Sequence, residues 1–473
     1  MNVLLISTYE LGHQPFGLAS PAAWLRQAGF SVVCLDLARE PMREELVRQA
    51  DFIAFYLPMH TATRLAARVA PAARRLNPAA HLCFYGLYAP LNADYLRKLG
   101  AQTILGGEFE GELVKAAGRV RDGLSNGAGE QPAPFVSLDR LNFVRPDRDG
   151  LPRLNRYAHL EHPESGSRVV GYTEASRGCK HLCRHCPVVP VYNGRFRIVP
   201  LEVVLDDVRQ QVASGAQHIT FGDPDFFNGI GHAVPLIKEF SRCFPGVAYD
   251  VTIKVEHLLK HSEHLLTLRE TGCLFVTSAV EAVDDAILAR LDKGHTLADF
   301  RRVVGLCRDA GLALSPTFVA FTPWTTLEGY AELLRIIVDL ELVQHVAPVQ
   351  LGIRLLIPAG SRLLDLDEIR NLVAPFDEAS LIYPWMNADP RVEALYRRVQ
   401  EVIRKGVANG DSRASIFNCL WEAAAQARGI TARTPAPLAL SGSPIPHLTE
   451  PWYCCAEPTG DELATVSWAE AQV

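Results

Sequence analysis

The sequence of 473 residues lacks the features that mark a membrane protein, a secreted protein or a nucleic-acid-binding protein. It has no run of about 18 apolar residues, so no membrane span is predicted. Residues 1–8 are too short for the apolar region of a signal peptide and have no basic leader. The net charge is −6, which is not the basic footprint expected for nucleic acid or an anionic membrane surface. We therefore expect neither of these partners.

The sequence also lacks the cysteine pattern of a secreted disulfide framework. Its eleven cysteines are an odd number, and some of them are bunched together. A reducing cytosol suits such a chain, so the expected location is cytoplasmic. The length suggests two or three domains, and a hydrophobic content of 48% is ample for large cores.

Three cysteines lie within eight positions, between an apolar run and a Pro-rich loop, with the spacing C-x3-C-x2-C: Cys179, Cys183 and Cys186. Thiolates this close together can converge on one iron–sulfur cluster. Three ligands leave one iron of a cubane open to another ligand. The alternatives are a structural zinc site with His181 or His185 as the fourth ligand, and buried cysteines without a ligand. No second pair of zinc ligands stands at the usual distance.

Residues 1–121 alternate strand-like and helix-like segments. Short apolar or β-branched runs are separated by amphipathic stretches such as 59–76 and 94–99. This alternation predicts an α/β domain with a doubly wound parallel sheet. Such sheets bind ligands at the carboxyl ends of their strands, which points to the loops 8–17 and 106–112. Residues 122–167 are rich in Gly, Pro, Asp, Asn and Arg and are predicted to be a linker on the surface.

Residues 168–361 form a second α/β series. Six strands are predicted, the first at 169–173, just before the cysteines, and the last at 349–357. Active sites of α/β barrels collect at the carboxyl ends of the strands, where the cysteines would then lie. Residues 362–445 carry two helical stretches that we expect to close the open edge of the barrel. Residues 446–473 form a tail.

The tail contains the segment Cys454-Cys455-Ala456-Glu457-Pro458. Together with the cysteine spacing and the order of the domains, this segment resembles one group of the radical S-adenosylmethionine (SAM) enzymes. That group has an N-terminal cobalamin-binding-like domain and a Cys-Cys-Ala-Glu-Pro tail, and the resemblance covers nearly the whole chain. It implies a partial (β/α)6 barrel, a [4Fe-4S] cluster held by the three cysteines, and SAM on the open iron. It also implies an electron donor such as flavodoxin or ferredoxin.

The resemblance implies SAM contacts from four residues of the barrel. Asp223 and Asp225 stand where the family holds the amino group of SAM, although its usual Gly-Gly-Glu is absent; a plain β–α turn is the alternative. Glu281 ends a partial match to the family's Gly-Val-Glu-Ser, and its alternative role is a helix cap. Arg354 lies in an apolar strand, where an unpaired charge is costly. We predict that it meets a carboxylate of SAM or substrate, with an ion pair to a neighbouring acidic residue as the alternative.

Cobalamin is left open. The segment from Leu105 to Glu112 resembles the end of the cobalamin-binding-type domain. The Asp-x-His-x-x-Gly pattern of proteins that coordinate cobalt from below is absent, because Glu10, His13 and Gly17 do not match it. We interpret His13 as an ordinary loop histidine, and this loop argues against a bound cobalamin.

The adjacent thiols of Cys454 and Cys455 are predicted to be catalytic. Neighbouring thiols chelate soft, thiophilic centres such as trivalent arsenic. The specific hypothesis is that they hold arsenic while a 3-amino-3-carboxypropyl group from SAM is attached to it, as in arsinothricin-type biosynthesis. A redox pair and a functionless end are alternative roles for the thiols. For the whole chain, the leading interpretation is a radical SAM enzyme that modifies a small-molecule substrate. The alternatives are a cobalamin-dependent radical SAM methyltransferase acting on an unactivated carbon or phosphorus and a non-catalytic thiol metal-binding protein.

Overall fold

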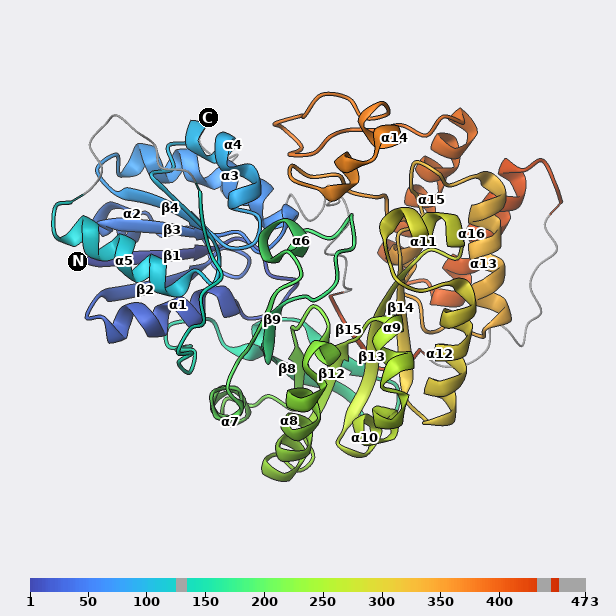
Figure 1. Ribbon diagram of the computed structural model, residues 1–473, viewed down its shortest axis with the longest axis horizontal. Helices are drawn as coiled ribbons and strands as arrows, with labels where there is room; N and C mark the ends of the chain where they lie inside the picture. Colours follow the sequence, from blue (N-terminus) through green and yellow to red (C-terminus); the bar gives the residue numbers. More distant parts are fainter. Residues whose placement is uncertain (125–133, 432–443, 451–473) are drawn as a thin grey trace.

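A computed structural model describes residues 1–124, 134–431 and 444–450. Cys454 and Cys455 lie outside these residues. Within the described part of the chain, no helix is long and apolar enough to cross a membrane. Two α/β units and a set of C-terminal helices make up the molecule (Figure 1).

The N-terminal unit is a six-stranded parallel sheet in the order β2-β1-β3-β4-β5-β6. Its strands are β1 (Asn2–Ser7), β2 (Ser31–Asp36), β3 (Phe52–Tyr56), β4 (His81–Tyr85), β5 (Thr103–Gly107) and β6 (Phe135–Ser137). Its helices are α1 (Phe16–Gln27), α2 (Glu44–Gln49), α3 (His60–Leu76), α4 (Ala93–Lys98) and α5 (Glu110–Arg121), with a 3-10 turn at Pro90–Asn92.

Both faces of this sheet are buried. In β1, Val3 and Leu5 belong to the core with α1 and α5, whereas Leu4 and Ile6 belong to the core with α2 and α3. Successive side chains of a strand point to opposite faces, so an uninterrupted apolar run requires helices on both sides. The predicted doubly wound domain is therefore confirmed.

The second sheet has the order β14-β13-β12-β11-β8-β7-β15 and curls into a half-barrel. Its parallel strands are β8 (Gly166–Thr173), β11 (His218–Phe221), β12 (Ala248–Thr252), β13 (Cys273–Glu281) and β14 (Ala313–Phe318). The helices beside them are α7 (Leu201–Ala213), α8 (Ile230–Cys243), α9 (Val255–Lys260), α10 (Leu265–Glu270), α11 (Asp285–Leu291), α12 (Leu297–Asp309) and α13 (Leu327–Asp339). Short 3-10 turns stand at Phe226–Gly229 and Ser262–His264.

The sixth parallel strand predicted at 349–357 was wrong. The segment starts with a 3-10 helix, Pro348–Leu351, and its pairing is limited to isolated bridges, such as that of Arg354 with Phe321 of the preceding segment. Pro348 has no N–H to give to a ladder, and its fixed φ favours a helical turn. The apolar pattern of 349–357 therefore records burial and not strand pairing.

The segment predicted as a surface linker contributes a strand to each sheet. β6 extends the N-terminal sheet, and β7 (His159–His162) pairs antiparallel with β8; the 3-10 turn Leu154–Arg156 precedes β7. Leu160 is fully buried against the half-barrel, and the Tyr157 hydroxyl donates to Asp36 Oδ2 of the first domain at 2.8 Å. The linker thereby fastens the two units together.

Two long helices, α15 (Pro390–Asn409) and α16 (Arg413–Ala427), pack beside α13 (Figure 1). Their buried apolar residues, such as Val399 and Leu420, join the core of the half-barrel. The turn Arg362–Asp365 and the short helix α14 (Asp367–Arg370) precede them. At the opposite edge of the sheet, β15 (His447–Leu448) pairs antiparallel with β7.

Candidate metal centre

The three predicted cysteines lie on one hairpin at the carboxyl end of β8. We call residues 176–198 the cysteine hairpin: β9 (Ser176–Gly178), the cysteine loop, α6 (Val188–Tyr192) and β10 (Phe196–Ile198), which pairs back on β9. Gly178 has φ +75°, and a Cβ there would stand 2.4 Å from the Tyr192 ring. Only glycine fits this turn into the loop.

The cysteine loop fits an iron–sulfur cluster. None of the three cysteines forms a disulfide within the described residues; Cys179 and Cys183 are buried and Cys186 is partly exposed. Burial raises the pKa of the Cys179 thiol to about 11. Lys254 Nζ lies 3.7 Å from Cys183 Sγ, and its side chain is buried. A buried ammonium group stabilises thiolates, which are the form that binds iron.

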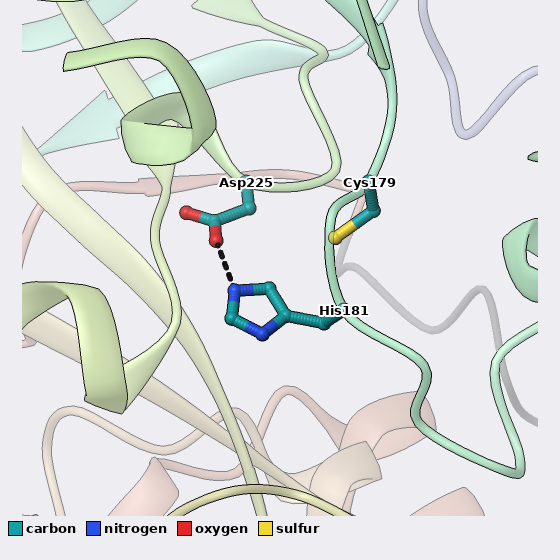
Figure 2. A group of neighbouring side chains, drawn as sticks. All are labelled: Cys179, His181 and Asp225. Carbon is teal, nitrogen blue, oxygen red and sulfur yellow. Dashed lines mark ion pairs between the residues drawn. The ribbon is translucent and has the colours of Figure 1, made fainter. Parts of the chain in front are cut away.

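The two histidines of the loop are turned toward carboxylates. The ring nitrogens of His181 lie 3.3 Å from Asp225 Oδ2 and 3.4 Å from Glu256 Oε2. His185 Nε2 lies 3.1 Å from Glu281 Oε1. Ligand atoms of Cys179, His181 and Asp225 lie within 4.8 Å of one another, and Figure 2 shows these side chains around one point. Each of these histidines thus has a carboxylate beside a ring nitrogen, which competes with a metal ion for that nitrogen.

Asp225 faces the cysteine loop. Its carboxylate accepts from the backbone N–H of Phe227 at 3.3 Å, and His257 Nδ1 lies 2.6 Å from Oδ2. Burial acts to raise the pKa of this carboxyl, but the hydrogen bonds from His181 and His257 outweigh it and hold the pKa below its usual range. Asp225 is therefore an ionised group beside the cysteine loop.

Asp223, from the same turn, is used differently. It accepts from the backbone N–H of Ala175 at 2.9 Å and from the Ser176 hydroxyl at 2.5 Å. Burial raises the pKa of its carboxyl to about 7. Asp223 thus holds the strand that leads into the cysteines, whereas Asp225 faces the loop itself.

Glu281 is buried at the end of β13. Its oxygen Oε1 lies 3.1 Å from His185 Nε2 and 3.3 Å from Lys293 Nζ, whose side chain is also buried. Burial alone would raise its pKa, but Lys293 and His185 lower it to about 2. Its φ of +72° is strained for a residue with a side chain, and such strain gathers at functional sites. The cap of α11 is made by Asp284, so the alternative role as a cap is not seen.

Arg354 lies in an ion pair instead of facing the cysteine loop. Its guanidinium donates to both oxygens of Glu393 on α15, at 2.9 and 3.1 Å. It stacks on the Trp385 ring at 3.8 Å and also donates to the Trp385 carbonyl. The structure thus shows the ion pair that was the alternative to a SAM contact.

Arg177 connects the cysteine hairpin to the N-terminal domain. Its buried guanidinium lies 3.3 Å from Glu108, 2.8 Å from Glu110 and 2.8 Å from Glu174. Burial raises the pKa of Glu108 and of Glu174 to about 7. Loop 106–112, at the carboxyl edge of the first sheet, is therefore packed against the metal centre.

Three groups of the site were not among the predicted site residues: Lys254, Lys293 and Arg177. Lys254 could have been found from the sequence, because it lies at the carboxyl end of the third predicted strand, residues 249–255. Nothing in the sequence indicates that Lys293 pairs with Glu281, or that Arg177 meets carboxylates about 70 positions away.

The described chain ends next to the N-terminal domain. Beyond β15, the backbone N–H of Thr449 donates to the carbonyl of His159, and the Tyr9 hydroxyl lies 2.5 Å from Glu450 Oε1. A Cβ at Gly12 would contact Glu450 at 2.8 Å. Loop 8–17 therefore contacts the end of residues 444–450, a segment that we call the arm.

Comparisons with known proteins agree with this fold and with the cysteine loop. Residues 173–334 match the model of the radical SAM superfamily. The half-barrel and its cysteine loop are therefore similar to this superfamily over residues 173–334. A [4Fe-4S] cluster and SAM are the cofactors typical of this class.

Curated relatives match part of the chain. The ribosomal protein uS12 methylthiotransferase RimO of Geotalea uraniireducens is 24% identical over 250 residues, 48% of this chain and 53% of the relative. The tRNA-2-methylthio-N(6)-dimethylallyladenosine synthase of Chlorobium phaeobacteroides is 30% identical over 159 residues, 30% of this chain and 34% of the relative. The chain thus spans between about a third and just over half of the length of these relatives.

Solved structures share the fold over more of the chain. The cobalamin-dependent SAM radical enzyme OxsB, with aqua-cobalamin and SAM bound, has a TM-score of 0.66 at 12% identity, covering 88% of this chain and 71% of that one. The radical SAM methyltransferase TsrM of Kitasatospora setae, with tryptophan and a SAM analogue bound, has a TM-score of 0.57 at 19% identity, covering 72% and 71%. The predicted fold class is confirmed by these structures.

Proposed function

We propose that this chain binds a [4Fe-4S] cluster through Cys179, Cys183 and Cys186, cleaves SAM reductively and modifies a small-molecule substrate. The observation that carries the proposal is the convergence of these cysteines on one hairpin beside the buried ammonium of Lys254. When bound, the reduced cluster supplies the electron that breaks a carbon–sulfur bond of SAM. The protein anchors, orients and shields the reactants.

The chain's own residues have distinct parts in this proposal. Asp225, ionised and held by two histidines, is the acceptor for the ammonium group of SAM. Glu281 is the second candidate for a SAM contact, and it also fixes the orientation of His185 within the cysteine loop. Asp223 positions the strand that precedes the cysteines.

The deciding experiment is anaerobic reconstitution with iron, sulfide and SAM, followed by mass identification of the SAM fragments. We expect C179A, C183A and C186A each to abolish both the brown colour and SAM cleavage. If all three variants kept the function of the protein, the alternative of a non-catalytic metal-binding protein that uses the thiols of the tail would be favoured instead.

The arsenic hypothesis is one finer form of the proposal. Its support is the soft-metal chemistry of adjacent thiols. Enzyme, SAM and arsenite should yield a product with a carbon–arsenic bond, and C454S/C455S should not. Formation of 5′-deoxyadenosine with arsenite unchanged would refute this form.

A cobalamin-dependent methyl transfer is the other finer form, and the comparisons support it better than the arsenic hypothesis. OxsB carries cobalamin and TsrM is described both with cobalamin and as a methyltransferase. Fold likeness at this identity does not carry a cofactor over, so the residues of the N-terminal domain have to be tested for their fit to a corrinoid.

The described residues do not fit a corrinoid at the carboxyl edge of the first sheet, where such folds bind ligands. A Cβ at Gly17 would lie 2.1 Å from the Tyr56 ring, so this ring fills the space in front of the first helix. The Tyr85 hydroxyl donates to the Gly17 carbonyl at 2.8 Å. The ring centres of Tyr56, Tyr85 and Phe109 lie no more than 6.0 Å from one another. Purified enzyme incubated with hydroxocobalamin and desalted should lack corrinoid absorption bands; stoichiometric retention would establish the cobalamin-dependent form.

A further inference from the structure

The cysteine hairpin has an unusual charge for this chain. Besides Arg177, which pairs with carboxylates of the N-terminal domain, it contains four basic residues and no Asp or Glu, although the whole chain has a net charge of −6. Two of the basic residues hold the structure together, since Arg184 donates to the carbonyls of Ala289 and Arg290 and Arg197 donates to the carbonyl of Leu138. The other two, Lys180 and Arg195, are exposed and form no ion pair within the described residues.

Apolar side chains lie exposed between these two cations. Leu182 is 39% exposed and Ile198 is 43% exposed. The Lys180 ammonium lies 4.9 Å from the centre of the Phe196 ring, and a Cβ at Gly194 would stand 3.3 Å from Leu182. We call this continuous surface the hairpin face: Lys180, Leu182, Arg195, Phe196 and Ile198.

The hairpin face lies next to the proposed cluster. Lys180 directly follows Cys179, and Leu182 directly precedes Cys183. The cysteines face inward and are mostly buried, while these neighbours face solvent. Exposed aliphatic groups rimmed by charge are typical of protein interaction sites.

We propose that the hairpin face is the docking surface for an acidic one-electron carrier protein, an inference that rests on the proposed function. The carrier gives up one electron and the cluster takes it up, without transfer of a proton or an atom. Complementary charge orients a partner and raises its association rate, while the aliphatic groups are buried on contact. A basic surface with no carboxylate in its chain segment fits an acidic carrier of the flavodoxin class.

The test compares two reductants on the full reconstituted enzyme. Dithionite reaches a cluster without docking, whereas an acidic flavodoxin with its reductase and NADPH must bind. We expect K180E/R195E to cleave SAM at the wild-type rate with dithionite and at least tenfold more slowly with flavodoxin. K180Q/R195Q should give an intermediate rate. The control K238E/R404E makes the same charge change at exposed positions of α8 and α15 and should match the wild type in both assays.

Direct binding of the flavodoxin, measured by calorimetry at low salt, separates this inference from the proposed function. We expect the wild type to bind, K180E/R195E to lose binding at least tenfold, and added salt to weaken binding. Equal binding by the wild type and K180E/R195E would overturn the docking surface even if SAM is cleaved. Loss of the dithionite reaction in K180E/R195E would also overturn it, because the face would then belong to the cluster site. A wild type that binds flavodoxin but cleaves no SAM with either reductant would refute the proposed function alone.

Discussion

Among single residues, Lys254 bears most directly on the proposed cluster. Its ammonium is buried 3.7 Å from Cys183 Sγ, and its carboxylate partner Glu256 lies at the same distance but is half exposed. A positive charge beside the sulfurs stabilises the reduced cluster. We expect K254M to lower the reduction potential of the cluster, on the order of 59 mV for a tenfold shift in a one-electron equilibrium.

EPR-monitored redox titration of the reconstituted variants measures this effect. K254R keeps the charge and should stay near the wild-type potential. A potential in K254M equal to that of the wild type would contradict the role of the charge.

Glu281 allows a prediction about stability. It is the carboxylate that balances buried Lys293 and His185. E281Q leaves Lys293 as an uncompensated buried charge, and breaking such a pair costs about 3–5 kcal/mol. The free energy of unfolding of the apo protein at neutral pH, from urea titration, should fall by this order.

E368Q is the matched control for that measurement. Glu368 pairs with Arg290 on the surface, where an ion pair contributes about 0–1 kcal/mol. A loss in E281Q as small as that in E368Q would mean that the buried group is not a pair in solution.

At the scale of elements, the cysteine hairpin depends on its first turn. G178A adds a Cβ at positive φ and 2.4 Å from the Tyr192 ring. We expect the loop to be displaced, with less iron and sulfide bound per chain after reconstitution. G305A, in the open space of α12, should bind the wild-type amount. Full iron content in G178A would show that the turn can be rearranged at little cost.

The burial of Glu108 in loop 106–112 predicts that the free energy of unfolding depends on pH. The pKa of Glu108 is raised from 4.5 to about 7 in the folded protein, so the native state holds a proton that the unfolded chain releases. The free energy of unfolding should therefore fall as pH rises from about 4.5 to 7, by at most about 1.4 kcal/mol per pH unit for this group. E108Q should have a shallower slope in urea titrations at several pH values; parallel curves would contradict the assignment.

Secondary structure with a strong pattern was predictable from the sequence, and short paired elements were not. The fully apolar run at residues 3–6 can only be a strand buried on both faces, and the spacing of the three cysteines defines their loop. β6 and β7 have three and four residues, and their stability comes from the sheets that they join. The apolar run at 349–357 suggested a strand because burial without pairing leaves the same pattern.

Site residues, too, were predictable where a local pattern marks them and not where they depend on a distant partner. Asp225 and Glu281 were predictable because they stand at strand ends beside the cysteines. The position of Arg354 depended on Glu393, a partner 39 residues away, which no local pattern indicates. Lys254 was within reach of the sequence because it, too, stands at a strand end, whereas only the folded chain brings Lys293 to Glu281 and the cysteine loop.

For the whole molecule, the arm after residue 443 ties the end of the described chain to its beginning. Thr449 and Glu450 contact the linker and loop 8–17. Y9F removes the hydrogen bond to Glu450, so backbone amides of residues 444–450 should exchange faster with deuterium while those of β1 stay unchanged. Unaltered exchange in the arm would show that the pairing of β15 with β7 holds it alone.

The strands β7 and β15 pair with each other although they are synthesised at different times. β7 is made early, and its partner His447–Leu448 only after the half-barrel strands and the helices α15 and α16. Because domains fold as they leave the ribosome, the cysteine hairpin can take shape before β15 exists. Iron can then be delivered to Cys179, Cys183 and Cys186 while Cys454 and Cys455 are still untranslated.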